Sequence, residues 1–340
     1  MLTIELLKKI DSQKMYDVYN RWPDIAEEFY AKNFSKIDLK DINNIVFAGM
    51  GGSGTIGDIF SSILSRTDIH VSVVKGYLLP KTVDKNTLVV CTSISGNTQE
   101  TLSILKNANK INGKFIGLSS GGLVQEFCKK NSVNHFQIEQ NHSPRSSLLG
   151  FLYSALKILE EIIPIDKNEI DESIKELHDV KRRISTDFLD SSNIAINLAE
   201  WIKEIPIVYY PSGLQAAAIR FKNSMQENSK THVMYEDIIE TSHNGIVAWE
   251  RPSNVQPILI QGVNDHIRTK ERWDVFKEFL KRNEIEYKEI FSVNGGILTK
   301  LVSLIYILDF TSIYNSVINK IDPSPVNSID FIKNKLDNNL

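Results

Sequence analysis

Short apolar segments alternate with helical segments along this chain, and that alternation limits its fold more than any other feature. In the first half the predicted strands are Ile45–Ala48, His70–Val74, Thr87–Cys91, Lys114–Leu118 and His135–Ile138, and the predicted helices among them are Thr55–Leu64, Gln99–Ala108 and Leu123–Lys130. Continuous apolar strands separated by helices are typical of a parallel sheet that helices cover on both faces. The sequence therefore predicts an α/β fold with a doubly wound parallel sheet.

The second half repeats this pattern. Its predicted strands are Ile205–Tyr210, Gln256–Gln261 and Glu286–Phe291, and its predicted helices are Gln215–Gln226, Thr269–Arg282 and Ile297–Val317. The segments NNIVFAGMGGSGTIGDIF and IPIVYYPSGLQAAAIRF share one order of strand, turn and helix. We therefore predict two copies of one α/β fold: an N-terminal domain with a leading helix at residues 1–165, a helical linker at 166–195, and a C-terminal domain with C-terminal helices at 196–340.

Bulk composition excludes several classes of partner. The formal net charge is −3, so no overall basic excess is present to hold a nucleic acid. No apolar run approaches the roughly 20 residues of a membrane span, and the N-terminus lacks the pattern of a signal peptide. The two cysteines, Cys91 and Cys128, have no metal-ligand spacing, which argues against a disulfide framework or a zinc site. These features predict a cytoplasmic protein.

A glycine turn, G-M-G-G-S-G at Gly49 to Gly54, follows the first strand and admits two interpretations. Glycines let the backbone approach an anion, and a helix N-terminus directs free N–H groups towards it. By spacing the turn matches a dinucleotide fingerprint, whereas Ser53 suits a single sugar phosphate. A dinucleotide fold places an acid at the end of its second strand, but this chain has Lys75 there. That residue counts against NAD and only mildly against NADP.

A second turn carries three hydroxyls. The residues are Ser93, Ser95 and Thr98, in the sequence S-I-S-G-N-T between the strand Thr87–Cys91 and the helix Gln99–Ala108. Turns at the carboxyl ends of parallel strands gather at one crevice, so these hydroxyls would meet Ser53 there. A single Ser or Thr at such a place is more often a helix cap. Two Gly/Ser/Thr turns, each after a strand, favour a phosphate monoester.

These turns carry a family resemblance. G-M-G-G-S-G followed by S-I-S-G-N-T is similar to the sugar isomerase (SIS) domain, and further matches extend from about Asn43 to Lys333. The matching segments, in order, are Pro144-Arg145, Gln226 to Lys230, Ser242-His243-Asn244, Trp249-Glu250, Asp309, Tyr314 and Asp322 to Pro325. In that order they resemble the bifunctional phosphoglucose/phosphomannose isomerase family, which has two SIS domains and is best known from archaea. The chain departs from the family pattern at Ile94, at Thr241-Ser242 and at Gly245.

The resemblance implies a reaction and a set of site residues. The reaction interconverts glucose 6-phosphate and mannose 6-phosphate with fructose 6-phosphate through a cis-enediolate, with no metal or redox cofactor. Glu227 would be the base, Arg145 would stabilise the enediolate, and Lys333 would reach the sugar hydroxyls or ring oxygen. His243, supplied by the partner subunit of a homodimer, would open the sugar ring. The phosphate would be held by Gly52, Ser53, Ser93, Ser95 and Thr98.

Plainer roles compete with these assignments. Glu227 has Lys230 three residues later, a spacing that suits a salt bridge on a helix face. Arg145 has Glu139 nearby as a charge partner, and a loop histidine such as His243 is more often a surface residue. At the level of function, the alternatives are a non-catalytic SIS regulator that binds sugar phosphates and another SIS enzyme, such as an amino-sugar phosphate isomerase.

Overall fold

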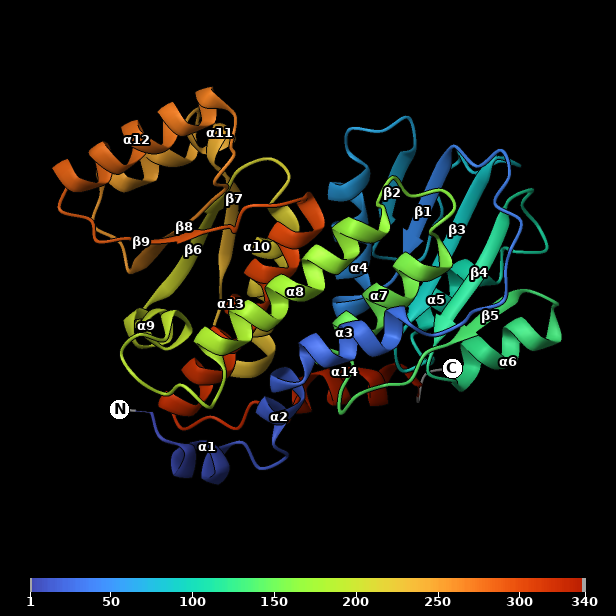
Figure 1. Cartoon of the computed structure of the whole chain (residues 1–340), viewed down its shortest axis with the longest axis horizontal. Helices are drawn as coiled ribbons and strands as arrows, with labels where there is room; N and C mark the ends of the chain where they lie inside the picture. Colours follow the sequence, from blue (N-terminus) through green and yellow to red (C-terminus); the bar gives the residue numbers. More distant parts are fainter. Residues whose placement is uncertain (1, 338–340) are drawn as a thin grey trace.

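Figure 1 shows the computed structural model, which describes residues 2–337, as two α/β units on either side of a central group of helices. The first sheet has the order β2-β1-β3-β4-β5, and every neighbouring pair is parallel. Its strands are β1 (Asn44–Ala48), β2 (His70–Val74), β3 (Thr87–Ser93), β4 (Lys114–Ser119) and β5 (Asn134–Gln137). The strand order reverses between β1 and β3, which is where doubly wound sheets bind their ligands.

The second sheet has the corresponding order, β7-β6-β8-β9, and is also parallel throughout. Its strands are β6 (Ile205–Tyr210), β7 (Met234–Asp237), β8 (Val255–Gln261) and β9 (Lys288–Phe291). The two parallel sheets, each flanked by helices, confirm the predicted α/β class and its duplication. The sequence missed β7, a four-residue edge strand in which Met234 and Tyr235 are exposed.

Helices fill the space between the sheets and cover their outer faces. The remaining elements are α1 (Ile4–Ile10), α2 (Met15–Asn20), α3 (Trp22–Tyr30), α4 (Gly51–Leu64), α5 (Gln99–Leu105), α6 (Gly122–Lys130), α7 (Leu148–Ile158), α8 (Lys167–Ile184), α9 (Ile194–Trp201), α10 (Gln215–Ser224), a π-helical turn (Met225–Ser229), α11 (Ile238–Thr241), a 3-10 helix (Gly245–Glu250), α12 (Ile267–Arg282), α13 (Ile297–Ile318) and α14 (Asn327–Asp337). Helices α4 and α10, the first of each α/β unit, pack against each other. Helix α8 lies in the predicted linker and packs along α13 and α3; the domain boundaries themselves stay a prediction.

Each interior strand of a sheet contributes side chains to two hydrophobic cores, one on each face of the sheet. This explains why its sequence is continuously apolar. On β1, Ile45 and Phe47 point into the large central core, while Val46 and Ala48 point into a smaller core under α5 and α6. Because successive side chains of a strand alternate between faces, both sets must be apolar when both faces are covered. A third core of the same kind lies on the outer face of the second sheet.

Helix α13 corrects the expectation that no segment reaches the length of a membrane span. It has 22 residues, and its most apolar window has a mean hydropathy of 1.5. However, 94% of that window is buried inside the protein. The helix also contains Asp309, whose charged side chain is fully buried. Helix α13 is therefore the central helix of the core, and its all-round apolar character follows from contacts with α8, α9 and α10.

Candidate active site

The structure brings the two predicted turns together at the reversal of strand order in the first sheet. Helix α4 begins at Gly51 without a side-chain cap, which leaves the N–H groups of its first turn free. Gly49 allows the close approach, because an added Cβ would lie 2.9 Å from the carbonyl oxygen of Thr92. The hydroxyl of Ser53 accepts a hydrogen bond from the N–H of Ile94, at 3.2 Å. The glycine turn and the hydroxyl turn thus form one wall.

The hydroxyls of this wall keep protons available for an anion. Ser93 and Thr98 share a hydrogen bond of 2.8 Å, so one of their two protons is used between them. Ser53 and Ser95 act as acceptors for backbone N–H groups, and each hydroxyl still has its own proton to donate. Thr98 occupies the N-cap position of α5, but its side chain makes no capping bond. The plain helix-cap interpretation therefore does not account for Thr98.

Lys75, which follows β2, is held by an acid from α4. Its ammonium group contacts both carboxylate oxygens of Asp58, at 2.6 and 2.8 Å. Burial raises the pKa of Asp58, and the charge of Lys75 acts in the opposite direction. The position where a dinucleotide fold would present a free acid to a ribose is therefore occupied by an ion pair.

Arg145 and Glu227 meet across the two α/β units. Nη1 of Arg145 lies 3.2 Å from Oε2 of Glu227, and the Arg145 side chain is only 4% exposed compared with 25% for Glu227. The Arg145 guanidinium also donates to Asn228 Oδ1 at 2.8 Å and to the carbonyl oxygens of Pro323 and Ser324 at 2.7 and 2.8 Å. These hydrogen bonds from Nε and Nη2 fix the guanidinium in place, and its Nη1 group points towards Glu227.

Neither of the plainer pairings forms. Lys230 donates to the backbone carbonyl of Glu227, at 2.7 Å, and also contacts the carbonyls of Asn228, Asp322 and Pro323, so it caps the π-helical turn. Glu139 lies 3.9 Å from Lys32 instead of pairing with Arg145. Glu227 lies within the π-helical turn that directly follows α10, a kind of turn that is frequent at functional sites, and its carboxylate contacts Arg145.

A buried network behind this pair was not predicted. Arg220 of α10 and Asp309 of α13 form an ion pair of 2.6 Å, with side chains 1% and 0% exposed. Arg220 also donates to the carbonyl oxygen of Arg145, at 2.7 Å. Asn228 donates to Ser312 at 2.8 Å, and the Ser312 hydroxyl donates to the carbonyl oxygen of Asp309. A single charge within each of two largely apolar stretches, QAAAIRF and YILDF, is the signal that could have found this pair.

A cavity of about 570 Å³ opens beside Glu227. It is lined by Gly51, Asn223, Gln226, Glu227, Lys230, Pro325, Val326, Asn327, Ser328 and Ile329. Gly51 belongs to the glycine turn, so the cavity adjoins the wall of hydroxyls, although Ser53, Ser93, Ser95 and Thr98 do not line it. The next residue, Gly52, packs against the loop before α7, since an added Cβ would lie 3.6 Å from the Cα of Arg145. The cavity therefore lies between the glycine turn and the ion pair of Arg145 and Glu227.

Two predicted residues lie away from this cavity. His243 is exposed just after α11, at the end of the second α/β unit that is opposite to α14 in Figure 1. Lys333 is exposed on α14, and only the first turn of that helix lines the cavity. A single chain thus assembles Glu227, Arg145 and the two turns, but not His243.

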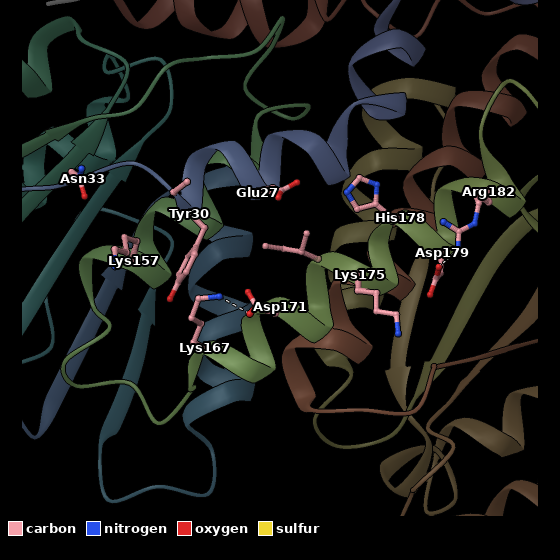
Figure 2. A pocket seen from close by; sticks show the side chains of 12 residues that line it. Glu27, Tyr30, Asn33, Lys157, Lys167, Asp171, Lys175, His178, Asp179 and Arg182 are labelled. Atoms are coloured by element: carbon pink, nitrogen blue, oxygen red, sulfur yellow. Dashed lines mark hydrogen bonds and ion pairs between the residues drawn. The ribbon is translucent and has the colours of Figure 1, made fainter.

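Figure 2 shows a larger hollow, of about 770 Å³, over α3 and α8. Its charged side chains are largely paired with one another or with neighbours: Lys167 with Asp171 at 2.5 Å, Lys157 with Glu160 at 2.7 Å, and Arg182 with Asp179. It contains none of the predicted site residues. Because its charges are compensated on the protein surface, we assign the chemistry to the smaller cavity.

Comparisons with known proteins match both halves of the chain to families. The family described as SIS domain matches residues 38–156, and the family described as bacterial phospho-glucose isomerase C-terminal SIS domain matches residues 191–336. A bifunctional phosphoglucose/phosphomannose isomerase of Caldicellulosiruptor bescii is 33% identical over 94% of this chain and 97% of its own. A D-glucosamine-6-phosphate 4-epimerase of Sulfolobus acidocaldarius is 27% identical over 72% of this chain and 77% of its own. In fold, a hypothetical protein of Thermus thermophilus is similar with a TM-score of 0.77 at 12% identity, covering 98% of this chain and 94% of that one.

Proposed function

The chain belongs to the bifunctional phosphoglucose/phosphomannose isomerase family, and on that basis we propose that it is an aldose–ketose isomerase that converts glucose 6-phosphate and mannose 6-phosphate to and from fructose 6-phosphate. The observation that carries the proposal is the contact between Arg145 and Glu227 at a cavity whose other wall is an uncapped glycine turn. One end of this cavity suits a phosphate, and the other suits a proton transfer.

Glu227 is the base of the reaction. Its carboxylate takes the proton from C2 of the open-chain aldose phosphate and returns a proton to C1, while the hydroxyl proton passes from O2 to O1. Glucose and mannose phosphates differ only in configuration at C2 and give the same enediol, so one base serves both substrates. Arg145 stabilises the negative charge that develops on the enediolate oxygens, because its guanidinium is buried and already oriented.

The phosphate group binds at the first α/β unit. Its contacts are the N–H groups at the start of α4, including that of Gly52, and the hydroxyls of Ser53, Ser93, Ser95 and Thr98. A dianion is favoured at the N-terminus of a 14-residue helix whose first turn has no cap. This placement leaves C1 and C2 of the sugar to reach towards Glu227.

Two further groups complete the proposed machinery. His243 of a partner subunit opens the sugar ring, which requires a homodimer, and Lys333 contacts the sugar from α14. The exposure of His243 supports this assignment, since the imidazole is free to enter another chain's cavity. We place the protein in the cytoplasm, in keeping with two free, buried cysteines.

Substituting Glu227 by Gln tests the base directly. We expect turnover of both aldose phosphates to fall by about 10²- to 10⁴-fold, because the proton transfer loses its base. A coupled assay measures turnover, and exchange of the C2 hydrogen with D₂O measures the proton transfer itself. Glu28→Gln, at an exposed carboxylate paired with Arg21, is the matched control and should leave both unchanged. Undiminished exchange in the Glu227 variant contradicts the assignment.

A subunit-mixing experiment tests the shared site. Glu227→Gln and His243→Ala homodimers should each be inactive, while a randomly mixed population should recover about a quarter of wild-type turnover, since each heterodimer has one intact site. No recovery after verified subunit exchange places His243 outside the partner's site. Substrates for all assays include glucosamine 6-phosphate, and turnover of that compound alone would favour the amino-sugar alternative. Binding of all of these without turnover would favour the regulator.

A further inference from the structure

The connection between α13 and α14 binds two cations through its backbone. Nη2 of Arg145 donates to the carbonyl oxygens of Pro323 and Ser324, at 2.7 and 2.8 Å. The ammonium group of Lys230 donates to the carbonyl oxygens of Asp322 and Pro323, at 3.2 and 3.3 Å. Arg145 contacts the proposed base, and Lys230 lines the cavity. The consecutive carbonyl groups of residues 322–324, which we call the carbonyl loop, therefore hold both positive charges beside the candidate active site.

The carbonyl loop has few restraints within its own backbone. Among residues 2–337, no hydrogen bond between two backbone groups involves residues 322–325. The two prolines restrict the loop in part, because Pro323 has a fixed φ and Pro325 disfavours a helical conformation at Ser324. Such restraints limit the conformation of the loop but do not tie it to the rest of the protein. Side chains therefore have to anchor it.

The carboxylate of Asp322 provides this anchor. Its Oδ1 accepts the N–H of Ser324 at 2.9 Å, which closes a turn over Pro323. Its Oδ2 accepts the hydroxyl of Ser12, at 2.6 Å, from the segment between α1 and α2. Figure 1 shows the connection from α13 to α14 passing beside that segment. One oxygen thus fixes the shape of the carbonyl loop, and the other ties it to α1 and α2, both of which contact α13.

We propose that Asp322 is a positioning residue for Arg145. Asp322 does not line the cavity, so it acts through the carbonyl loop. Its carboxylate orients the carbonyl oxygens of Pro323 and Ser324, and these hold Nη2 of the arginine. Because the guanidinium is planar and rigid, fixing Nη2 also fixes Nη1, which lies 3.2 Å from Glu227. A donor stabilises an enediolate best when it is in place before the charge develops. The inference rests on the proposed function in one respect, that Arg145 stabilises the enediolate.

Two substitutions of Asp322 separate its hydrogen bonds from its charge. Alanine removes both hydrogen bonds, whereas asparagine keeps an acceptor for the Ser324 N–H and has an amide that can donate to the Ser12 hydroxyl. We expect Asp322→Ala to lower kcat about 10- to 100-fold, because a displaced catalytic group costs about that much. KM should change little, since the phosphate binds at the turns of the first unit. Asp322→Asn should retain most of the wild-type kcat. Equal losses of kcat in the two variants, or an unchanged kcat in Asp322→Ala, contradict the proposal.

Asp190 provides the matched control. Its carboxylate accepts the N–H of Ser192 at 2.8 Å and the hydroxyl of the same residue, in an exposed loop between α8 and α9. Asp190→Ala removes the same two kinds of hydrogen bond and should leave kcat and KM unchanged. Ser12→Ala removes only the outer bond of Asp322 and should lower kcat about two- to tenfold. Circular dichroism verifies folding of each variant. If Asp322→Ala does not fold, an unchanged kcat in Ser12→Ala overturns the proposal.

Binding of an enediolate analogue tests the same role without turnover. The probe is 5-phosphoarabinonate, a sugar acid phosphate whose carboxylate stands in for the enediolate oxygens, and isothermal titration calorimetry measures its affinity. Asp322→Ala should weaken binding of this probe by about tenfold and leave binding of inorganic phosphate unchanged. Equal affinity of the wild type and Asp322→Ala for the probe overturns the positioning role. A wild type that binds the probe tenfold better than the variant, but acts on no sugar phosphate, would overturn the proposed function and leave the positioning role standing.

Discussion

The two α/β units have the same strand order but differ in what occupies the turns at their crevices. After β1 and β3 of the first unit, the turns present the uncapped start of α4 and the hydroxyls of Ser53, Ser95 and Thr98. After β8 of the second, the carboxylate of Asp265 accepts the N–H of Gly262 at 2.9 Å and the indole N–H of Trp273 at 3.3 Å. The second crevice thus contains an anion that belongs to the chain itself.

This difference suits a division of labour, in which only the first crevice binds a phosphate and the second unit provides the base. A turn that is satisfied by its own carboxylate neither needs nor attracts a phosphate, because the two negative charges would repel each other. The second unit contributes through its first helix instead, since α10 packs against α4 and continues into the π-helical turn that presents Glu227. Under the proposed function, the first unit binds the phosphate and the second provides the base.

The largest effect is expected at the buried ion pair of Arg220 and Asp309, which lies in the second unit and holds Arg220 against the carbonyl oxygen of Arg145 in the first. In Asp309→Asn a buried guanidinium loses its counter-charge, so we expect the free energy of unfolding to fall by about 3–5 kcal/mol. Urea denaturation followed by circular dichroism measures this change. Glu271→Gln breaks the exposed pair with Arg268 and should cost less than about 1 kcal/mol. Equal losses in the two variants would show that the buried pair stabilises the protein no more than an exposed pair does.

A smaller effect is expected on KM, which should respond to a substitution in the turn after β1 but not in the corresponding turn after β6. Ser53→Ala removes a hydrogen bond to the phosphate, worth about 1.5–3 kcal/mol for a charged partner, so KM should rise about 10- to 100-fold. Ser212, exposed in the corresponding turn after β6, provides the control Ser212→Ala, for which KM should not change. Steady-state kinetics on both aldose phosphates measures the difference. A comparable rise in KM for both variants contradicts the division of tasks.

The smallest effect concerns the carboxylate that fills the second crevice. Burial raises the pKa of Asp265 above its ordinary value of 3.8, while the hydrogen bonds from Gly262 and Trp273 act to lower it. A raised carboxyl pKa means that the folded state binds the proton more tightly, so stability falls as pH rises from about 4 through the folded pKa. Asp265→Asn keeps an acceptor oxygen without the charge, and unfolding free energies at pH 4 and pH 7 should therefore differ less than in the wild type. KM of the variant should be unchanged. A larger pH dependence of the unfolding free energy in the variant would contradict a raised pKa for Asp265.

The sequence predicted strand bounds well where a strand is a short apolar run, including the edge strand β2, whose side chains are exposed or half-buried. The bounds of β2 and β6 were predicted to the residue, and those of β1 and β8 to within one residue. The N-terminal helical region was not resolved into α1, α2 and α3, because the break between α1 and α2 depends on a single left-handed residue, Lys14, at φ 55°. The edge strand β7 was missed because its sequence, Met234 to Asp237, lacks a continuous apolar run.

The sequence by itself determined the two parallel sheets and the glycine turn, because alternating apolar segments and glycine spacing are local properties of the chain. Only the tertiary structure decided which charges meet. Arg145 contacts Glu227, 82 residues away, and Arg220 contacts Asp309, 89 residues away, whereas the neighbouring residues Lys230 and Glu139 do not form the pairs that their spacing suggests. Those contacts depend on the packing of α4, α10 and α13, and that packing is set by the shape of the shared core rather than by the sequence near any one charge.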